Sequence, residues 1–282
     1  MNVRKVTAAS AVALSLALAA TACGGGKKDS AGGNGGDKGG KITIGIKIDQ
    51  PGIGLQTPDG KYTGFDVDVA KYVAKELGYE EGDIVFKETK SADRETAIER
   101  GDVKFIAASY SINDKRLAKV DFAGPYLLAH QDILVRADET SITKPEDLNS
   151  KKLCSVTGST SAQNVKDKLA PKAQLQEYGG YSECLTGLEN KVIDALTTDD
   201  SILAGYASQE AFKGKFKLAG FKMSNENYGI GLKKGDAELK DKINKALEKM
   251  VADGSWQKAV DANFGPAGYK NEPAPKIGNI VK

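Results

Sequence analysis

The sequence predicts an α/β protein in which strands alternate with helices along the chain. Apolar runs of strand length, such as Phe105 to Ala108, alternate with segments whose apolar residues recur at helical spacing, such as Phe65 to Leu77. Polar residues and helix-start signals follow the strand-like runs. This alternation favours a sheet with crossover connections, and the ligands of such sheets bind at the carboxyl ends of the strands.

The overall composition narrows the class of protein. The chain has 282 residues, of which 40 are basic and 38 acidic, and its formal charge is +2. This length is enough for one large or two medium domains. Because the charges nearly balance, the chain lacks the strongly basic surface of nucleic-acid-binding proteins, and we expect no nucleic-acid partner.

Residues 1–22 have the features of a secretory signal peptide. Arg4 and Lys5 precede an apolar stretch that is too short for a comfortable membrane span. Small residues stand directly before Cys23, which predicts a lipoprotein signal with the lipid on Cys23; ordinary cleavage beside an incidental cysteine is the alternative. Residues 23–40 contain no large apolar residue and predict a flexible linker. We therefore expect an exported lipoprotein on the outer face of the cytoplasmic membrane.

Cys154 and Cys184 are the remaining cysteines. Exported proteins commonly contain disulfides, so we expect these two residues to pair; two free buried thiols are the alternative. Their separation excludes a Cys-X-X-Cys redox motif, so the expected role is structural.

One stretch carries the clearest signal for a ligand site. A predicted strand ends in Ser109 and Ser111, Asn113 offers a helix N-cap, and Arg116 falls in the first turn of that helix. Hydroxyls, free helix N–H groups and a guanidinium together suit a carboxylate. For an arginine taken by itself, a surface salt bridge is the alternative.

The same stretch resembles the extracellular solute-binding proteins that serve ABC transporters of polar amino acids. The resemblance covers about residues 41–264 and implies a two-lobed, type II periplasmic-binding-protein-like α/β fold with two strands crossing between the lobes. Its ordered matches are Gly64-Phe65-Asp66-Val67-Asp68-Val69-Ala70, Ser111-Ile112-Asn113-Asp114-Lys115-Arg116, Val120-Asp121-Phe122-Ala123-Gly124-Pro125-Tyr126, Gly158-Ser159-Thr160-Ser161 and Val192-Ile193-Asp194-Ala195-Leu196.

The resemblance also sets the expected domain bounds. Lobe 1 comprises residues 41–129 together with 226–282, and lobe 2 comprises residues 130–225. After residue 264 the Pro- and Gly-containing sequence reads as a tail.

For the α-carboxylate of an amino acid, the resemblance implies a clamp by Arg116, with Ser111 beside it and Thr160 opposite. For the ammonium, it implies Asp199 together with the Ser109 carbonyl. This interpretation makes Asp200 the N-cap of the following helix, and the exchange of these two roles stays open.

Three residues are expected around the ligand side chain. The family commonly has an aromatic residue near position 91, whereas this chain has Ser91 with Arg94 one helical turn further on, and Lys47 stands where acidic-amino-acid binders have another base. Two cations and a hydroxyl would suit a second carboxylate, which favours glutamate and then aspartate. Solvated charge is the alternative for Lys47 and Arg94, and glutamine or another polar amino acid is the alternative ligand. Thr198 is also placed to reach the ligand side chain.

Two other classes of protein are alternatives. Some relatives on this fold are dehydratases or cell-wall lytic enzymes, which need a general acid or base in the cleft. The sequence shows no Ser/His/Asp set, no P-loop and no metal-ligand cluster, since it has a single histidine and its internal cysteines are expected to pair. A sensory receptor ectodomain is the other alternative, but no transmembrane helix or signalling domain follows. We therefore expect a monomeric binding protein, without cofactor or metal, that delivers its ligand to a transmembrane permease.

Overall fold

The structure is a computed structural model, and it describes residues 40–282, which belong to one compact unit. The predicted signal peptide, the proposed lipidation site at Cys23 and nearly all of the predicted linker lie outside the described residues. Among residues 40–282, none of the helices combines the length and apolar character needed to cross a bilayer.

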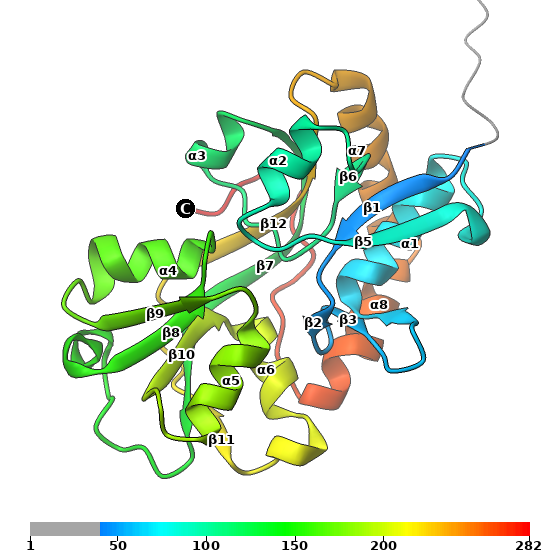
Figure 1. Cartoon of the computed structure of the whole chain (residues 1–282). Coiled ribbons are helices and arrows are strands. Elements are labelled where there is room, and N and C mark those ends of the chain that lie inside the picture. Colours follow the sequence, from blue (N-terminus) through cyan, green and yellow to red (C-terminus); the bar gives the residue numbers. More distant parts are fainter. Residues whose placement is uncertain (1–39) are drawn as a thin grey trace, which may run out of the picture. The chain divides into compact units, whose positions relative to one another are not determined.

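Two α/β lobes make up this unit (Figure 1). A nine-stranded sheet has the order β5-β1-β6-β12-β7-β10-β8-β9, with β11 beside β7. The strands of the first lobe are β1 (Ile42–Ile46), β5 (Ile84–Glu88) and β6 (Phe105–Ile106), next to a small sheet of β2 (Asp49–Gln50), β3 (Gly54–Gln56) and β4 (Tyr62–Thr63). The strands of the second lobe are β8 (Lys152–Val156), β9 (Gln174–Tyr178), β10 (Ala195–Asp199) and β11 (Phe216–Leu218).

Two strands connect the lobes. β7 (Asp121–Arg136) pairs antiparallel with β12 (Asn225–Leu232) as far as His130, and it pairs with β10 from Gln131 onward. A single long strand therefore contributes hydrogen bonds to both halves of the molecule.

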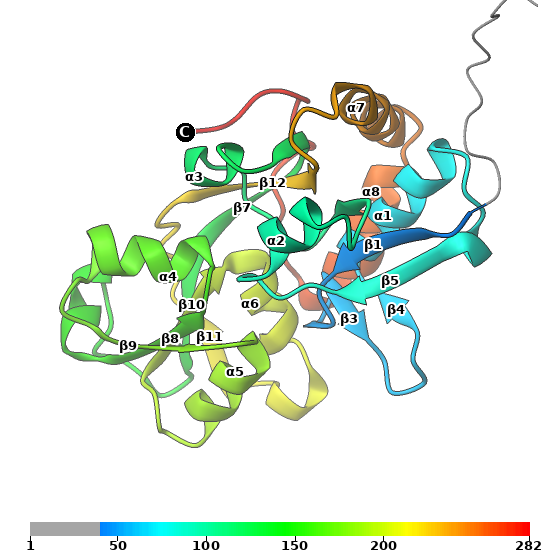
Figure 2. The ribbon, with the colours of Figure 1, turned by 45° about the horizontal axis from the view of Figure 1, so that its top comes forward.

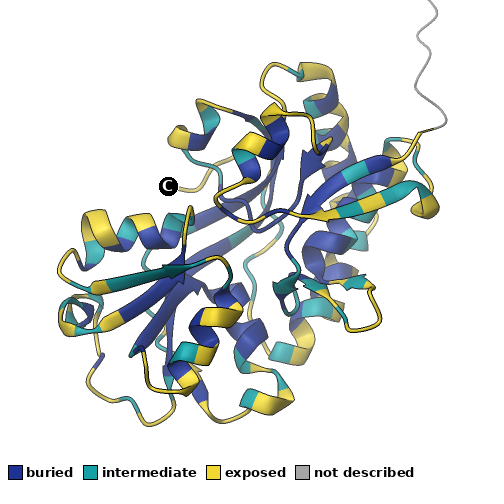
Figure 3. Ribbon diagram, viewed as in Figure 1, coloured by how far each residue is buried: buried dark blue, intermediate teal, exposed yellow. Residues whose placement is uncertain are grey.

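The helices of the first lobe follow the predicted apolar periodicity. α1 (Phe65–Glu76), α7 (Ala237–Ala252) and α8 (Ser255–Phe264) pack against one another, and Figure 2 shows them together on one side of this lobe. Their apolar stripes are buried, and Figure 3 shows that the central strands are buried as well. Such stripes form the core against which the sheet packs. The shorter helices of this lobe are η1 (Glu81–Asp83), α2 (Arg94–Glu99), α3 (Asp114–Leu117) and η5 (Gly265–Ala267).

The second lobe is built on shorter helices. α4 (Thr160–Asn164) continues into a π-helical turn, η3 (Val165–Leu169), and α6 (Asp200–Ala207) follows β10 directly. The other helices of this lobe are η2 (Pro145–Ser150), α5 (Tyr181–Glu189) and η4 (Glu210–Phe212).

A disulfide joins β8 to α5, as predicted. Cys154 and Cys184 have Cα atoms 5.6 Å apart and are separated by 30 residues in the sequence. Both residues are fully buried, so the bond ties a strand of the second lobe to the helix that covers it.

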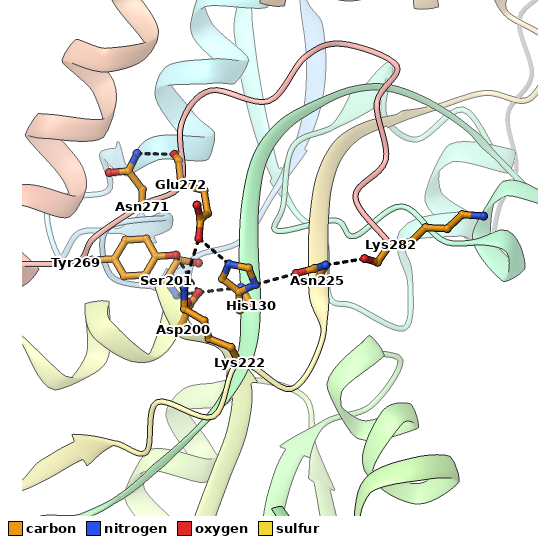
Figure 4. A network of polar contacts seen from close by, with 9 residues as sticks. All are labelled: His130, Asp200, Ser201, Lys222, Asn225, Tyr269, Asn271, Glu272 and Lys282. Atoms are coloured by element: carbon orange, nitrogen blue, oxygen red, sulfur yellow. Dashed lines mark hydrogen bonds and ion pairs between the residues drawn. The ribbon is translucent and has the colours of Figure 1, made fainter.

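The C-terminal segment, residues 268–282, lies along the two crossing strands and is more than a tail (Figure 4). The Tyr269 hydroxyl donates a hydrogen bond to Asp200 Oδ1 at 2.9 Å. The other contacts of this segment in Figure 4 join Glu272 to His130 and to Lys222, and Lys282 to Asn225.

Candidate functional site

A small pocket lies between the two lobes, where strands of both lobes end. Six of the nine predicted ligand-binding residues line it, namely Ser91, Arg94, Ser109, Arg116, Thr160 and Asp199. They come from both lobes, as the carboxyl ends of α/β strands predict. Lys47, Ser111 and Thr198 are also buried, but they do not line this pocket.

Lys47 and Arg94 are buried cations, and the alternative of solvated charge is wrong. Their exposed fractions are 5% and 2%. Lys47 Nζ donates to Ser91 Oγ at 2.9 Å, and Arg94 Nη1 donates to the carbonyl of Ser109 at 3.2 Å. Arg94 Nε has no hydrogen-bond partner among residues 40–282. An unpaired buried N–H of a guanidinium is costly, so this group is suited to an incoming acceptor.

The positive charges of Arg94 and Arg116 lower the pKa values of neighbouring cations. Burial, followed by the charge of Arg94, lowers the pKa of Lys47 to about 7. Burial, followed by the charge of Arg116, lowers the pKa of Arg94 to about 10. Concentrated positive charge of this kind is relieved by an anion, which would raise the pKa of each group again.

Arg116 starts from the predicted helix cap and reaches the opposite lobe. Asn113 is the N-cap of α3, and its side chain accepts from the Arg116 backbone N–H at 2.9 Å. Arg116 Nη1 donates to the Ser111 carbonyl at 2.6 Å, and Nη2 donates to the Gly158 carbonyl at 3.0 Å. The guanidinium thus connects β6 and α3 of the first lobe to the loop that follows β8.

Tyr110 supports both guanidinium groups. The Cζ atoms of Arg94 and Arg116 lie 4.1 Å and 5.0 Å from the centroid of the Tyr110 ring. An aromatic ring offers a cation an attractive surface without neutralising its charge, so both groups stay available to an anion.

Asp199 is the acidic wall of the pocket. It ends β10, and Tyr228 donates a hydrogen bond to its Oδ2 at 2.5 Å, whereas its Oδ1 has no partner in the described part of the chain. Burial, and next the charge of Glu226, raises the pKa of Asp199 well above its usual range. A ligand ammonium would offset both effects, because a nearby positive charge favours the ionised carboxylate.

Asp200 points away from the pocket lining and into the contacts drawn in Figure 4. Its Oδ1 accepts hydrogen bonds from the His130 backbone N–H and the Tyr269 hydroxyl. The expectation that Asp200 is the N-cap of the next helix is wrong, because Asp199 occupies the N-cap position and Asp200 is the first residue of α6. β10 ends at Asp199 and α6 begins at the next residue, so no separate cap residue stands between the strand and the helix.

Several residues of the site were missed by sequence reasoning. Ser159 and Ser161 line the pocket beside Thr160, and their place in one Gly-Ser-Thr-Ser stretch could have indicated them. Tyr181 and Ile202 also line it, and they come from the first turns of α5 and α6. Their role depends on long-range packing, for which the local sequence offers no signal.

Gln50 was missed as well. Its side-chain Oε1 accepts from Ser109 Oγ at 3.1 Å, and its Nε2 has no partner within residues 40–282. A buried amide whose NH2 group has no partner, next to a pocket residue, is a further candidate contact for a ligand carboxylate.

Comparisons with known proteins agree with this architecture. Residues 42–266 match the family described as bacterial extracellular solute-binding proteins, family 3. The glutamate-binding protein GluB of Corynebacterium efficiens is 47% identical over 274 residues, covering 93% of this chain and 91% of that protein. GluB of Corynebacterium glutamicum is 49% identical over 258 residues, covering 87% and 85%. The glutamine-binding protein GlnH of Bacillus subtilis is 38% identical over 218 residues, covering 77% and 78%.

Solved structures share the two-lobed fold. An ancestral arginine-binding protein bound to arginine matches with a TM-score of 0.75 and 36% identity, covering 80% of this chain and 99% of that one. The cysteine-binding protein of Campylobacter jejuni matches with a TM-score of 0.76 and 26% identity, covering 84% and 94%. The relatives named here are binding proteins, which confirms the prediction of a binding protein over an enzyme. The chain therefore belongs to the bacterial extracellular solute-binding proteins of family 3.

Proposed function

We propose that this protein captures an acidic amino acid, glutamate first and aspartate second, and delivers it to an ABC-type permease. The observation that carries the proposal is the burial of three cations, Lys47, Arg94 and Arg116, around one pocket whose opposite wall holds Asp199. Glutamate carries two carboxylates and one ammonium, which match these charges. The 47% and 49% identity to proteins named as glutamate-binding supports the same ligand.

The backbone end of the ligand is assigned first. Arg116, with Ser111 and the backbone N–H of Thr160 at the start of α4, holds the α-carboxylate, and Asp199 holds the ammonium with the Ser109 carbonyl. Support comes from Arg116, whose two terminal guanidinium nitrogens donate to carbonyl oxygens at 2.6 and 3.0 Å, while its Nε lies 3.6 Å from the Glu95 carboxylate. A carboxylate is a stronger, charge-assisted acceptor for the same donors.

The side-chain end is assigned to Lys47, Ser91 and Arg94, with Thr198 nearby. Glutamine has the shape of glutamate but lacks the second negative charge. It would leave two buried cations without a counter-charge, and a buried charge without a partner costs several kcal/mol by the usual order of magnitude.

Ligand capture works by closure of the lobes. Arg116 of the first lobe and Gly158 of the second lobe are already in contact at 3.0 Å. A ligand held by residues of both lobes binds the closed state better than the open state. Its binding therefore shifts the population of protein molecules toward the closed state. The closed protein then presents both lobes to the permease in one arrangement.

The direct test is calorimetric titration of the purified protein with glutamate, aspartate, glutamine, arginine and histidine. We expect tight glutamate binding and much weaker glutamine binding. Arg116→Ala should abolish binding of every amino acid, whereas Arg94→Ala should weaken glutamate far more than glutamine. Arg100→Ala, an exposed arginine directly after α2, is the matched control. Equal losses for glutamate and glutamine in Arg94→Ala would refute the assigned side-chain subsite.

Membrane anchoring through a lipid on Cys23 is also part of the proposal, and it is supported by the small residues before Cys23 and the linker-like sequence after it. The family description as extracellular agrees with export. Cys23→Ser should move the protein from the membrane fraction to the soluble exported fraction. Retention of the variant at the membrane would contradict lipid anchoring, and sedimentation should show a monomer in either case.

A further inference from the structure

Glu226 lies directly behind the site without lining it. It belongs to the crossing strand β12 and is 3% exposed. Its Oε2 accepts from the Thr160 hydroxyl at 2.9 Å, and its Oε1 accepts from the Ser224 hydroxyl at 2.7 Å. Thr160 in turn lines the pocket. The carboxylate is therefore linked to the ligand site through one side chain.

Glu226 also stands beside the acidic wall of the pocket. Residues two apart in a strand share one face, so Glu226 and Tyr228 point to the same side of β12. The Tyr228 hydroxyl is bonded to Asp199 at 2.5 Å. After burial, the charge of Glu226 is the next cause of the raised pKa of Asp199.

Neither of these two acids has an ion-pair partner within the described residues, although the more distant charge of Arg116 acts on Asp199. Across residues 40–282, no lysine, arginine or histidine nitrogen lies within 4.0 Å of the carboxylate of either Asp199 or Glu226. Burying two carboxylates without a cation is unfavourable unless a cation is supplied. The hydroxyl donors of Thr160, Ser224 and Tyr228 lower this cost but leave the charge in place.

We propose that Glu226 is a positioning and specificity residue, which orients Thr160 and adds a second negative charge behind Asp199, so that the pocket selects α-amino dicarboxylates over dicarboxylates that lack the amino group. The inference rests on the proposed function, since it concerns how the same pocket treats glutamate. It goes further in naming the class of compound that is rejected and the residue that rejects it.

The reason is electrostatic. Glutamate brings an ammonium to the acidic end of the pocket, where Glu226 attracts it. Glutarate brings the same two carboxylates without the ammonium, so Glu226 only repels it. Removal of this one charge should therefore change the two affinities in opposite directions, whereas a loss of packing would weaken both ligands.

The experiment compares glutamate and glutarate binding to the wild-type protein and to Glu226→Gln by calorimetry at pH 7. We expect the glutamate Kd to rise on the order of tenfold and the glutarate Kd to fall severalfold, or glutarate binding to become measurable for the first time. Glu99→Gln, an exposed acid on α2, is the control for a general loss of one negative charge. Thermal unfolding of each variant verifies that it is folded.

A conservative variant separates charge from packing. Glu226→Asp keeps the charge and should retain the preference for glutamate over glutarate, even if the shorter side chain weakens both ligands. If glutarate binds neither wild type nor Glu226→Gln, or if the variant weakens both ligands equally, the inference is overturned while glutamate binding stands. If the wild-type protein does not bind glutamate, the proposed function fails and the inference fails with it.

Discussion

The backbone N–H of Ser109 donates a hydrogen bond to Asp66 Oδ2 at 2.6 Å, and Ser109 adopts a φ of +44°. A residue other than glycine rarely occupies this left-handed region, and the surrounding structure must hold it there. Asp66 also accepts from the Tyr126 hydroxyl at 2.7 Å. Helix α1 thereby fixes the loop after β6, from which Ser109 enters the pocket.

Asp66→Ala should destabilise the protein by about 2–4 kcal/mol, because two donors, Ser109 N–H and Tyr126 OH, would lose their buried acceptor. Denaturant unfolding measures this difference. Asp68→Ala, on the same helix and with a single hydrogen bond to the Asn263 side chain, should cost about 1 kcal/mol and serves as the control. Equal effects of the two variants would show that Asp66 does not hold the strained loop.

Glutamate binding should weaken as the pH rises above 7. The pKa of free Lys47 is lowered to about 7, so the free protein loses this proton near neutral pH. The bound carboxylate favours the charged form, so binding above pH 7 takes up a proton and Kd should rise by up to about tenfold per pH unit.

Lys47→Met should bind glutamate more weakly, and its Kd should no longer rise as the pH increases from 7 to 8.5. Titrations at each pH in two buffers of different ionisation enthalpy would count the protons taken up. A wild-type Kd that stays constant over this range would contradict the assignment of Lys47 to the ligand carboxylate.

Loss of the disulfide should destabilise the second lobe. The bond between Cys154 and Cys184 closes a loop of 30 residues, which in the chain-entropy model stabilises the fold by roughly 3–4 kcal/mol. The double variant Cys154→Ser/Cys184→Ser should lower the free energy of unfolding by about this amount. Reduction of the wild-type protein should have the same effect and should leave the variant unchanged.

Tyr269→Phe should lower the free energy of unfolding by about 1 kcal/mol, because the hydroxyl of Tyr269 bonds the carboxylate of Asp200. Tyr79→Phe is a matched control, since Tyr79 is also half-buried and its hydroxyl makes no hydrogen bond within residues 40–282. If both variants were equally stable, the C-terminal segment would contribute little through this contact.

Local signals in the sequence were sufficient for the α/β class and for the position of one anchor of the site, whereas the two-lobed arrangement followed from the family resemblance. The cap at Asn113 placed Arg116 in the first turn of α3, because a capping bond joins residues only three apart. The apolar stripe from Phe65 to Leu77 predicted the face that α1 buries, because the period of 3.6 residues is a property of the helix itself. Ordered matches along the chain indicated the family.

Tertiary structure decided the contacts between distant segments. The bond from Thr160 to Glu226 joins residues 66 positions apart, and the pocket wall at Tyr181 and Ile202 comes from the first turns of α5 and α6. The burial of Lys47 and Arg94, and the choice of Asp199 over Asp200 as the pocket residue, depend on how the two lobes pack. Local propensity and periodicity determine the individual helices and strands. The desolvation and pairing of charged side chains depend on neighbours that only the folded chain brings together.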